Sequence, residues 1–332
     1  MVSILLIPLF LSFFITLFFI PIWIKKAKEI GLVWEDMNKP ERPKNIAGSG
    51  GVIVLFGFLL GTLGFIALKT FYFKSSDNLV EIFASLSVVL IIAFVGFMDD
   101  LFGWRKGGLS KKSRLILLIF ASIPLIVINA GESSMAGIGF GLLYPLFFIP
   151  LGIVGASATF NFLAGYNGLE TSQGILIIFS LSVITFLMGN KGLSVIGLCM
   201  VASLVGFYLF NKYPAKVFPG DIMTYSVGAL IAVLAILGNM EKIAIFFFIP
   251  YILETGLKLR GKLKKESFAK VNEDGSLDMP FEKVYGLEHI AICILKKVKK
   301  KVYERDIVYL INAFQILIII LGLVIFKNSL FY

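Results

Sequence analysis

Two adjacent carboxylates interrupt an otherwise apolar stretch of this sequence. An apolar run that ends in Phe94-Val-Gly-Phe-Met98 leads directly into Asp99 and Asp100, and a basic segment from Arg105 to Arg114 follows. Carboxylates are costly in hydrocarbon, so the pair is expected where a membrane helix reaches the surface. Neighbouring acids also repel each other unless a cation is close. The pair indicates a metal or phosphate site, although a solvated helix end would be the better explanation of an isolated Asp-Asp.

A second polar segment could supply neutral ligands. Asn161-Phe-Leu-Ala-Gly-Tyr-Asn-Gly-Leu-Glu170 contains no Lys or Arg. Asn161, Asn167 and Glu170 offer oxygens, and Gly165 offers bare backbone. Such groups suit hydrogen bonding to a base or coordination of a metal. The alternative is a simple polar turn.

A third carboxylate, Asp221, follows the segment Lys216-Val-Phe-Pro-Gly and directly precedes an apolar run. Pro-Gly predicts a tight turn. Asp221 is then expected at a helix N-terminus, where the helix dipole favours its charge. Taken alone it would be read as an N-cap, but it joins Asp99 and Asp100 on the same expected face.

Two longer loops flank these segments. Glu35–Pro43 is polar and turn-rich, and it leads into Gly48-Ser-Gly-Gly51. Those glycines fit close approach of a ligand and tight helix packing about equally. Near the end of the chain, Phe268–Met279 centres on Asn-Glu-Asp-Gly and predicts a β-hairpin. Leu287–Val298 has helical apolar spacing beside lysines and predicts an amphipathic helix on an anionic leaflet. His289, within it, is expected at the interface rather than in catalysis.

Composition fixes the class of protein that must position these residues. Of 332 residues, 58% are hydrophobic and 16% charged. Such values are typical of a polytopic membrane protein and exclude a soluble globular domain. His289 is the single histidine, which argues against a histidine zinc site or a Ser-His-Asp triad. Cys199 and Cys293 indicate no disulfide framework.

Apolar runs of spanning length, about 20 residues, predict ten transmembrane helices in a single membrane domain covering the whole chain. We expect them at Val2–Ile24, Gly48–Leu68, Val80–Met98, Leu115–Ala130, Ile138–Phe160, Ser172–Met188, Leu193–Phe210, Ile222–Gly238, Ile243–Leu257 and Asp306–Phe326.

Charge asymmetry predicts the orientation. Loops 25–47, 99–114, 161–171, 211–221 and 258–305 carry 26 of the 31 Lys and Arg residues. The positive-inside rule makes this face cytoplasmic and both termini external. It also explains the net charge of +10 without a nucleic-acid partner. The sequence therefore predicts an all-α polytopic membrane protein with cytoplasmic active-site loops and a small β-hairpin in the last inner loop.

The order of the polar segments resembles the polyprenyl-phosphate N-acetylhexosamine-1-phosphate transferases over nearly the whole chain. Phe97-Met-Asp-Asp100 is similar to the family's membrane-edge Asp-Asp motif. Gly108-Leu-Ser-Lys-Lys-Ser-Arg-Leu115 is similar to the basic segment after it, with Arg114 where the family usually has Lys. Asn161–Glu170 resembles the eukaryotic motif Asn-Ile-Leu-Ala-Gly-Ile-Asn-Gly-Leu-Glu, and Val217-Phe-Pro-Gly-Asp221 resembles the metal-binding Phe-x-Gly-Asp motif.

Within that family the chain looks more like the eukaryotic enzyme that starts N-glycan assembly on dolichyl phosphate. The Asn-Glu-Asp-Gly hairpin, Tyr303-Glu-Arg-Asp306 and Gln315-Ile-Leu317 carry this likeness. The triple histidine of the bacterial muramoyl-pentapeptide branch is absent, although Leu257-Lys-Leu-Arg-Gly-Lys262 is similar to that branch. A eukaryote-like enzyme without the histidines suggests an archaeal source.

The resemblance implies an integral enzyme of the cell membrane that transfers N-acetylglucosamine 1-phosphate from UDP-N-acetylglucosamine to a polyprenyl, dolichyl-type, phosphate and releases UMP. This would be the first step of lipid-linked oligosaccharide assembly. Transfer of another UDP-N-acetylhexosamine to undecaprenyl phosphate is the alternative within the family. Oligomeric state, including a homodimer, prenyl length and a direct or two-step mechanism stay open.

The chemistry of two anionic substrates calls for a hard cation and basic residues. Oxygen ligands without sulfur or imidazole favour Mg²⁺, with Mn²⁺ as a substitute. By resemblance, Asn161 and Asp221 would bind the metal. Asp99 or Asp100 would orient or deprotonate the lipid phosphate, or support the metal through water.

The resemblance also assigns the uridine contacts. Phe218 would stack on uracil against Gly165, while Asn167 and the Met37 backbone would read its edge. The candidates for binding the substrate phosphates are Lys111, Arg114 and Lys265. Lys39 and Glu170 are further candidates for the site, without a specific role.

A transporter or lipid flippase is the competing class of protein. It would usually place ionisable groups at mid-membrane depth and show repeat symmetry. Neither is visible in the sequence. A CDP-alcohol phosphotransferase would need a spaced acidic motif that is also absent.

Overall fold

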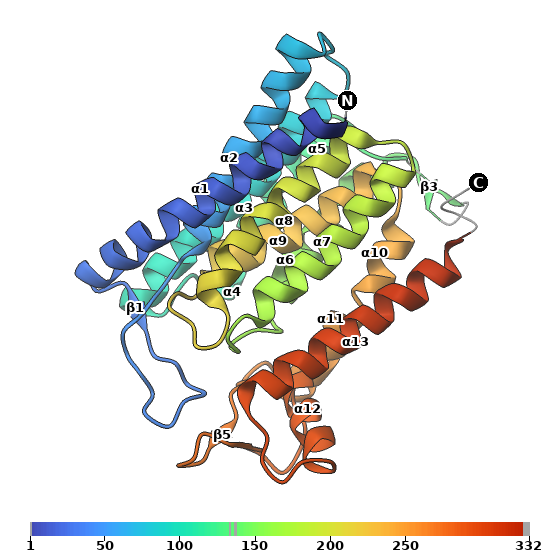
Figure 1. Ribbon diagram of the computed structural model, residues 1–332. Coiled ribbons are helices and arrows are strands. Elements are labelled where there is room, and N and C mark those ends of the chain that lie inside the picture. The colour runs from blue at the N-terminus through green and yellow to red at the C-terminus, as the bar shows by residue number, and fades with distance from the viewer. Residues whose placement is uncertain (1, 133, 136–137, 328–332) are drawn as a thin grey trace.

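The apolar runs fold into a helical bundle in the computed structural model, which describes residues 2–132, 134–135 and 138–327 (Figure 1). Within these residues, seven helices are long and apolar enough to cross a membrane. They are α1 (Val2–Glu29), α2 (Gly51–Ala67, extended by the π-helical segment η1, Leu68–Tyr72), α3 (Leu79–Lys106), α7 (Leu169–Leu187), α8 (Lys191–Asn211), α9 (Gly220–Leu237) and α13 (Glu304–Ile325).

The other three expected spans are each divided into two helical segments. Pro124, Pro150 and Pro250 each occupy the second position of the later segment. Proline lacks the N–H that would continue the preceding hydrogen-bond pattern. The chain therefore breaks before Pro124 and Pro250, and it changes from π-helix to α-helix just before Pro150. The expected span from Ile138 also begins later, at Tyr144, because 138–139 form a strand. The segments are α4 (Lys111–Ala121) with α5 (Ile123–Val127), η2 (Tyr144–Phe148) with α6 (Ile149–Phe160), and α10 (Glu241–Phe247) with α11 (Ile249–Arg260).

Helix α3 is longer than its apolar run. It continues through Asp99 and Asp100 and ends only at Lys106, before Gly107 in the left-handed conformation. The expected boundary at Met98 is therefore too early. Consecutive residues on a helix point about 100° apart, so the two acids face different neighbours.

Short antiparallel ladders organise the loops. β1 pairs with β2, and Ala47 forms a further bridge with Val217. This joins the first inner loop to the segment before α9. The predicted hairpin is present as β5 paired with β6, and β3 pairs with β4 near the other end of the bundle. The strands are β1 (Val33–Trp34), β2 (Ile46–Ala47), β3 (Ser134–Met135), β4 (Ile138–Gly139), β5 (Lys270–Val271) and β6 (Leu277–Asp278).

The glycines before α2 serve packing between chain segments. The Gly50 N–H donates to the Phe218 carbonyl at 2.9 Å, and the Gly51 N–H donates to the Pro219 carbonyl at 2.9 Å. A Cβ on Gly51 would lie 2.6 Å from the Met223 Cβ. Of the two interpretations left open by the sequence, close packing is therefore the one that applies to Gly50 and Gly51.

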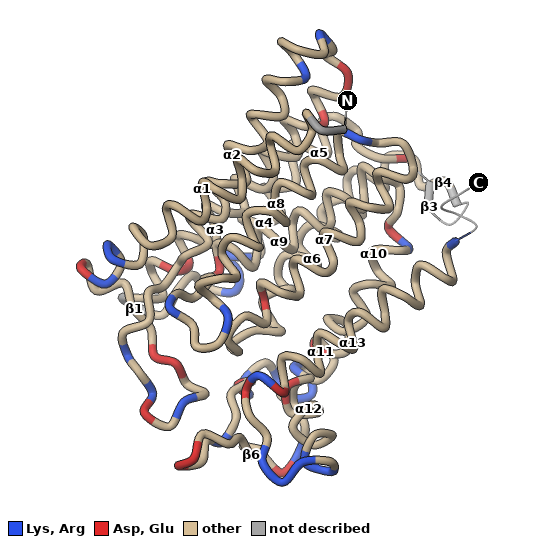
Figure 2. Tube along the Cα trace, in the orientation of Figure 1, with Lys and Arg blue, Asp and Glu red and all other residues tan. Residues whose placement is uncertain are grey.

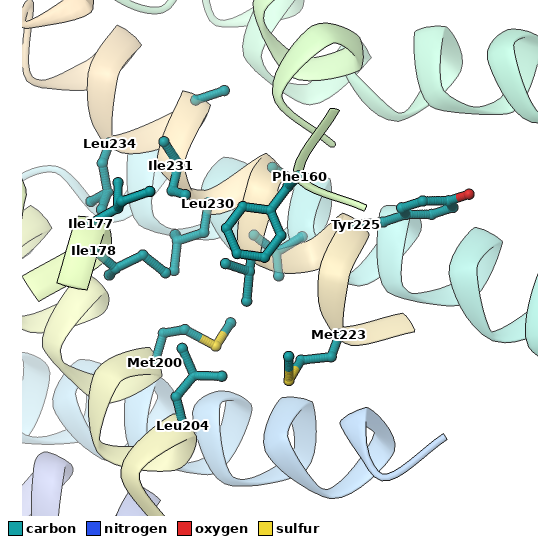
Figure 3. Packing of buried hydrophobic residues seen from close by; sticks show 14 of the residues in the cluster. Phe160, Ile177, Ile178, Met200, Leu204, Met223, Tyr225, Leu230, Ile231 and Leu234 are labelled. Carbon is teal, nitrogen blue, oxygen red and sulfur yellow. The ribbon is translucent and has the colours of Figure 1, made fainter. Parts of the chain in front are cut away.

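Helix α9 forms the centre of the bundle and fixes the position of the site. Every residue from Ile222 to Ile236 is buried. In Figure 3, Leu230 and Ile231 face the side chains of α7 and α8 across the apolar core. On another side, a Cβ on Gly96 of α3 would lie 2.6 Å from the Asp221 carbonyl oxygen, so α3 and the start of α9 are in direct contact.

The last inner loop is folded onto the protein. α12 (Leu287–Lys296) is the predicted amphipathic helix, and Leu287, Ala291 and Ile292 are buried. His289 is also fully buried, with its ring 5.8 Å from that of Phe281. The expectation that His289 lies at the membrane interface is therefore wrong, because α12 packs against α11 and α13.

Charged residues gather at one end of the bundle, where the expected inner loops lie (Figure 2). The start of α1 and the end of α13 both lie toward the opposite end (Figure 1). The loops predicted to carry the chemistry thus share one face of the protein.

Candidate active site

A cavity of about 400 Å³ opens among the inner loops. It is bounded by α3, the segment between α6 and α7, the start of α9 and the last inner loop. Nine of the residues predicted from the sequence line it: Met37, Asp99, Asp100, Arg114, Asn161, Gly165, Glu170, Phe218 and Asp221.

The two predicted metal ligands are in direct contact. Asn161 Nδ2 donates a hydrogen bond to Asp221 Oδ1 at 3.0 Å. The hydroxyl of Thr224, one turn further along α9, donates to Asn161 Oδ1 at 3.0 Å. A carboxylate and a side-chain amide from two different segments are thereby held together in the cavity wall.

Asp100 anchors the start of α9. Its Oδ1 accepts from the Asp221 N–H at 2.7 Å, and its Oδ2 lies 3.4 Å from the donating Ile222 N–H. Backbone N–H groups in the first turn of a helix lack intrahelical partners. Asp100 supplies those partners from α3 and so fixes where Asp221 stands.

Asp99 faces the basic segment instead. Its Oδ2 lies 2.5 Å from Arg114 Nη2 and accepts from the Tyr225 hydroxyl at 3.3 Å. Its Oδ1 accepts from the Leu109 N–H at 2.7 Å. Its side chain is only 2% exposed, so this carboxylate has three donors in a nearly dry setting.

Two glycines make room for the acid pair. Gly220 has φ +74°, and a Cβ there would lie 2.2 Å from Asp100 Oδ2. Gly108 has φ +78°, and its Cβ would lie 2.7 Å from Asp99 Oδ1. Any other residue at either position would be strained in the backbone and would displace a carboxylate.

The predicted uridine wall is partly assembled. Met37, Gly165 and Phe218 all line the cavity. The Gly165 N–H donates to Glu170 Oε1 at 2.9 Å, and Asn38 Nδ2 donates to the Gly165 carbonyl at 2.9 Å. The backbone that would lie against a base is therefore held from both sides, and Glu170 has a positioning contact.

Asn167 and Lys39 lie behind this wall. Asn167 Nδ2 donates to Asp36 Oδ2 at 3.1 Å, and its Oδ1 accepts from the Ala215 N–H at 2.8 Å. Lys39 contacts Glu304 and lies 3.2 Å from Asp36 Oδ2. Both side chains join inner loops to one another, and neither lines this cavity. Their roles toward substrate stay predictions.

A second cavity, a groove of about 540 Å³, adjoins the first. The remaining predicted phosphate ligands, Lys111 and Lys265, line it with apolar side chains such as Leu115 and Leu118. The Lys265 ammonium lies 4.6 Å from the ring centre of Phe281. Five residues line both cavities: Arg114, Asn161, Ala164, Gly165 and Phe268.

Sequence reasoning missed three residues of the site. Thr224 and Tyr225 stand three and four positions after Asp221, and helical periodicity from Asp221 would have placed them on the same face. Phe268 contacts the backbone at Gly165, where a Cβ would lie 3.0 Å from its ring. It belongs to the last inner loop, and no local pattern in the sequence indicates this long-range contact.

Within the described residues, no three His, Cys, Asp or Glu side chains form a group able to hold a metal ion. A cation bound here would therefore depend on a mixed set of carboxylate and amide oxygens. The cavity offers acidic and amide groups, and the Arg114 guanidinium lies beside Asp99.

Comparison with known proteins gives the site its context. The sequence model described as glycosyl transferase family 4 matches residues 82–239. A protein of Saccharolobus solfataricus, provisionally named UDP-N-acetylglucosamine–dolichyl-phosphate N-acetylglucosaminephosphotransferase, is 36% identical over 91% of both chains. One of the same name in Sulfolobus acidocaldarius is 32% identical over 90% of this chain and 89% of its own.

A phospho-N-acetylmuramoyl-pentapeptide-transferase of Streptococcus pyogenes serotype M6 is 29% identical over 75% of this chain and 77% of its own. The residues matched by the family 4 model, 82–239, include most of α3, the segment 161–168 and the start of α9. With its apolar helices, the protein is an integral membrane protein, and the chain belongs to glycosyl transferase family 4.

Proposed function

We propose that this protein transfers N-acetylglucosamine 1-phosphate from UDP-N-acetylglucosamine to a dolichyl-type polyprenyl phosphate and releases UMP. The names of the two relatives with 36% and 32% identity support this activity. The observation that carries the proposal is the junction of the two cavities. A polar cavity and an apolar-walled groove share Arg114, Asn161 and Gly165, so a nucleotide sugar and a lipid phosphate could meet there.

The polar cavity would hold the nucleotide. Phe218 and the Gly165 backbone would enclose the uracil, and the pyrophosphate would extend toward Asn161 and Asp221. Arg114 supplies the positive charge on the side of the groove, where a guanidinium can bind phosphate oxygens in a bidentate manner.

The groove would hold the acceptor. Its apolar side chains suit the first prenyl units, and Lys111 and Lys265 line it beside Arg114. In the reaction, an oxygen of the lipid phosphate forms a bond to the β-phosphorus of the nucleotide sugar. The bond from that phosphorus to the bridging oxygen breaks, and UMP leaves with the electron pair. The residues contribute mainly by positioning and by balancing charge.

Mg²⁺ fits the donor set of Asn161 and Asp221, and Mn²⁺ is the expected substitute. Rotating the Asn161 amide would turn Oδ1 toward Asp221, and the Thr224 hydroxyl could then accept from Nδ2 instead of donating. Both ligands could thus present oxygen without losing the bond to Thr224. When bound, the cation would neutralise charge on the pyrophosphate and the leaving UMP.

We also propose ten membrane crossings with the site on the cytoplasmic face of the cell membrane and both termini outside. Three two-part helical segments, added to seven long helices, support an even number of crossings. The 26 basic residues on the loops at the site support the orientation.

The test is purified protein with Mg²⁺, a panel of UDP-sugars and two polyprenyl phosphates, scored by UMP release. We expect turnover with UDP-N-acetylglucosamine that depends on the lipid phosphate. Turnover restricted to the muramoyl-pentapeptide nucleotide would favour the activity named for the streptococcal relative. Release of UMP from no nucleotide would refute the proposed reaction and leave a transporter as the alternative.

A further inference from the structure

Tyr225 places a buried hydroxyl at the junction of the two cavities. It follows Asp221 by one helical turn on α9 and is 1% exposed. Figure 3 shows its hydroxyl directed away from the apolar core around Leu230 and Met200. The hydroxyl donates to Asp99 Oδ2 at 3.3 Å. Tyr225 lines the groove, whereas Asp99 lines the polar cavity, so this hydrogen bond crosses from one to the other.

The same carboxylate oxygen is shared with Arg114. Arg114 Nη2 lies 2.5 Å from Asp99 Oδ2, and the guanidinium carbon lies 5.8 Å from the centre of the Tyr225 ring. Arg114 lines both cavities. An acceptor phosphate in the groove could therefore engage the Arg114 guanidinium directly.

Engagement of a phosphate through Nη2, the nitrogen that contacts Asp99, would weaken the contact with Asp99. That carboxylate is almost fully buried, and a buried charge that loses a donor is costly. The Leu109 N–H binds the other oxygen, so it cannot replace Arg114 at Oδ2. The Tyr225 hydroxyl already donates to Oδ2 and can shorten its bond there.

We infer that Tyr225 is a positioning residue for the acceptor phosphate: it keeps Asp99 hydrogen-bonded and in place while Arg114 moves to the phosphate. The inference deepens the proposed function and depends on it. It adds a tyrosine hydroxyl to the acceptor side of the site, while the nucleotide side is left unchanged.

The experiment compares Tyr225→Phe with wild type, varying each substrate in turn at saturating concentrations of the other. The variant keeps the ring and loses only the hydroxyl. We expect kcat/KM for polyprenyl phosphate to fall about 10-fold or more, the scale of one hydrogen bond to a charged group. The KM for the nucleotide sugar should change less than about 2-fold.

A matched control is available at the opposite end of the bundle. Tyr144 is equally buried and donates its hydroxyl to Glu241. Tyr144→Phe therefore removes the same kind of bond far from the site, and we expect its kinetic constants for both substrates to stay at wild-type values. Thermal unfolding of both variants measures the purely structural cost.

A double-mutant cycle that combines Tyr225→Phe with Arg114→Lys tests whether the two residues act through Asp99. Because Tyr225 and Arg114 act on one oxygen of Asp99, their effects on kcat/KM for the lipid should be less than multiplicative. Unchanged kinetic constants in Tyr225→Phe would overturn the inference, and so would equal losses for both substrates. A loss of stability in Tyr225→Phe with wild-type kinetics would also overturn it. A wild-type protein that releases no UMP would instead refute the proposed function itself.

Discussion

The Asp100 carboxylate accepts a hydrogen bond of 2.7 Å from the backbone N–H of Asp221. Two acids 121 residues apart in the sequence are thus linked through the side chain of one and the backbone of the other. Asp99, next to Asp100, faces Arg114 and Tyr225 instead. The adjacent acids therefore have separate tasks, one toward the first turn of α9 and one toward the basic segment.

Separate tasks predict separate kinetic effects. Asp99→Asn and Asp100→Asn should each cut turnover by at least ~100-fold, the scale of losing a positioned electrostatic group. Asp100→Asn should also raise the Mg²⁺ concentration for half-maximal activity, because the start of α9 loses the charge and one of the two acceptor oxygens that anchor it. Asp99→Asn should leave that concentration unchanged. Mg²⁺ titrations of the activity of both variants test this difference. The same Mg²⁺ dependence in Asp99→Asn and Asp100→Asn would count against separate roles for the two acids.

Lys39 is expected to matter for stability. Its side chain is 13% exposed, and it contacts Asp36 and Glu304, which are 4% and 2% exposed. Lys39→Met would leave both acids buried without a cation, at a cost of about 3–5 kcal/mol. Thermal unfolding in detergent measures this, with the exposed Lys44→Met as control. A stable Lys39→Met protein with a raised nucleotide KM would instead place Lys39 at the substrate.

Glu288 lies in an unusual setting in the last inner loop. A Cβ on Gly286 would lie 2.6 Å from Glu288 Oε2 and 3.2 Å from Glu254 Oε1, so the two carboxylates are close neighbours. Lys258 Nζ lies 3.5 Å from Glu254 Oε1, and among the described residues neither Glu288 oxygen finds a hydrogen-bond partner. Burial, and then the charge of Glu254, raise the pKa of Glu288 well above its ordinary value.

A raised carboxyl pKa means that the folded protein holds this proton more tightly than the unfolded chain. Its stabilising contribution is complete at acidic pH and is lost as pH rises through the folded-state pKa. Glu288→Gln should remove that loss, so the variant should be at least as stable as wild type at pH 8. Thermal unfolding from pH 5 to pH 8.5 tests this against the exposed Glu282→Gln. Parallel pH profiles for wild type and Glu288→Gln would exclude the buried-proton account.

Local pattern predicts much of this protein because its constraints are local. Apolar runs and basic loops indicated the helices and the shared face, and Asn-Glu-Asp-Gly indicated the hairpin at Lys270–Asp278. The breaks before Pro124 and Pro250, and the change from π- to α-helix before Pro150, could also have been predicted, since proline acts on its own helix. A prediction of spans from the length of apolar runs alone does not detect these interruptions.

The contacts that determine the role of each site residue are long-range and could not be predicted from the sequence. Nothing near Asn167 indicates that its amide binds Asp36 and Ala215 rather than facing the cavity. Nothing near Phe268 indicates the backbone at Gly165. The residue types in the sequence identified which side chains could take part in chemistry. The packing of the loops determines which of these side chains face the cavities.

Orientation in the membrane gives a further prediction. Single cysteines introduced at Lys44, Lys111, Lys216 and Lys283, all exposed, should resist an impermeant thiol reagent added to intact cells. Cysteines at Lys74, Lys191 and Lys242 should react. The parent protein would carry replacements of Cys199 and Cys293. External labelling at any of the first four positions would contradict the ten-crossing arrangement.

The metal prediction concerns Asp221 and Asn161, whose side chains are 3.0 Å apart. If both bind one Mg²⁺, removing the Asp221 charge should weaken metal binding as well as the rate. Asp221→Asn should raise the Mg²⁺ concentration for half-maximal activity. Asp221→Ala should be essentially inactive, because charge on the pyrophosphate is then uncompensated. A carboxylate that only supports a ligand would act more gently, on the order of 10- to 100-fold.

Mg²⁺ and Mn²⁺ titrations of wild type and both Asp221 variants separate these cases. Thr224→Val is a useful companion, since it removes the hydroxyl that holds the Asn161 amide and leaves the Asp221 carboxylate in place. If the amide must present its oxygen to the metal, Thr224→Val should shift Mg²⁺ dependence in the same direction as Asp221→Asn, but less. Retained activity and unchanged metal dependence in Asp221→Ala would remove Asp221 from the metal site. Asp99 and Asp100 would then be the ligands to test, because both line the same cavity and Asp100 contacts the Asp221 backbone.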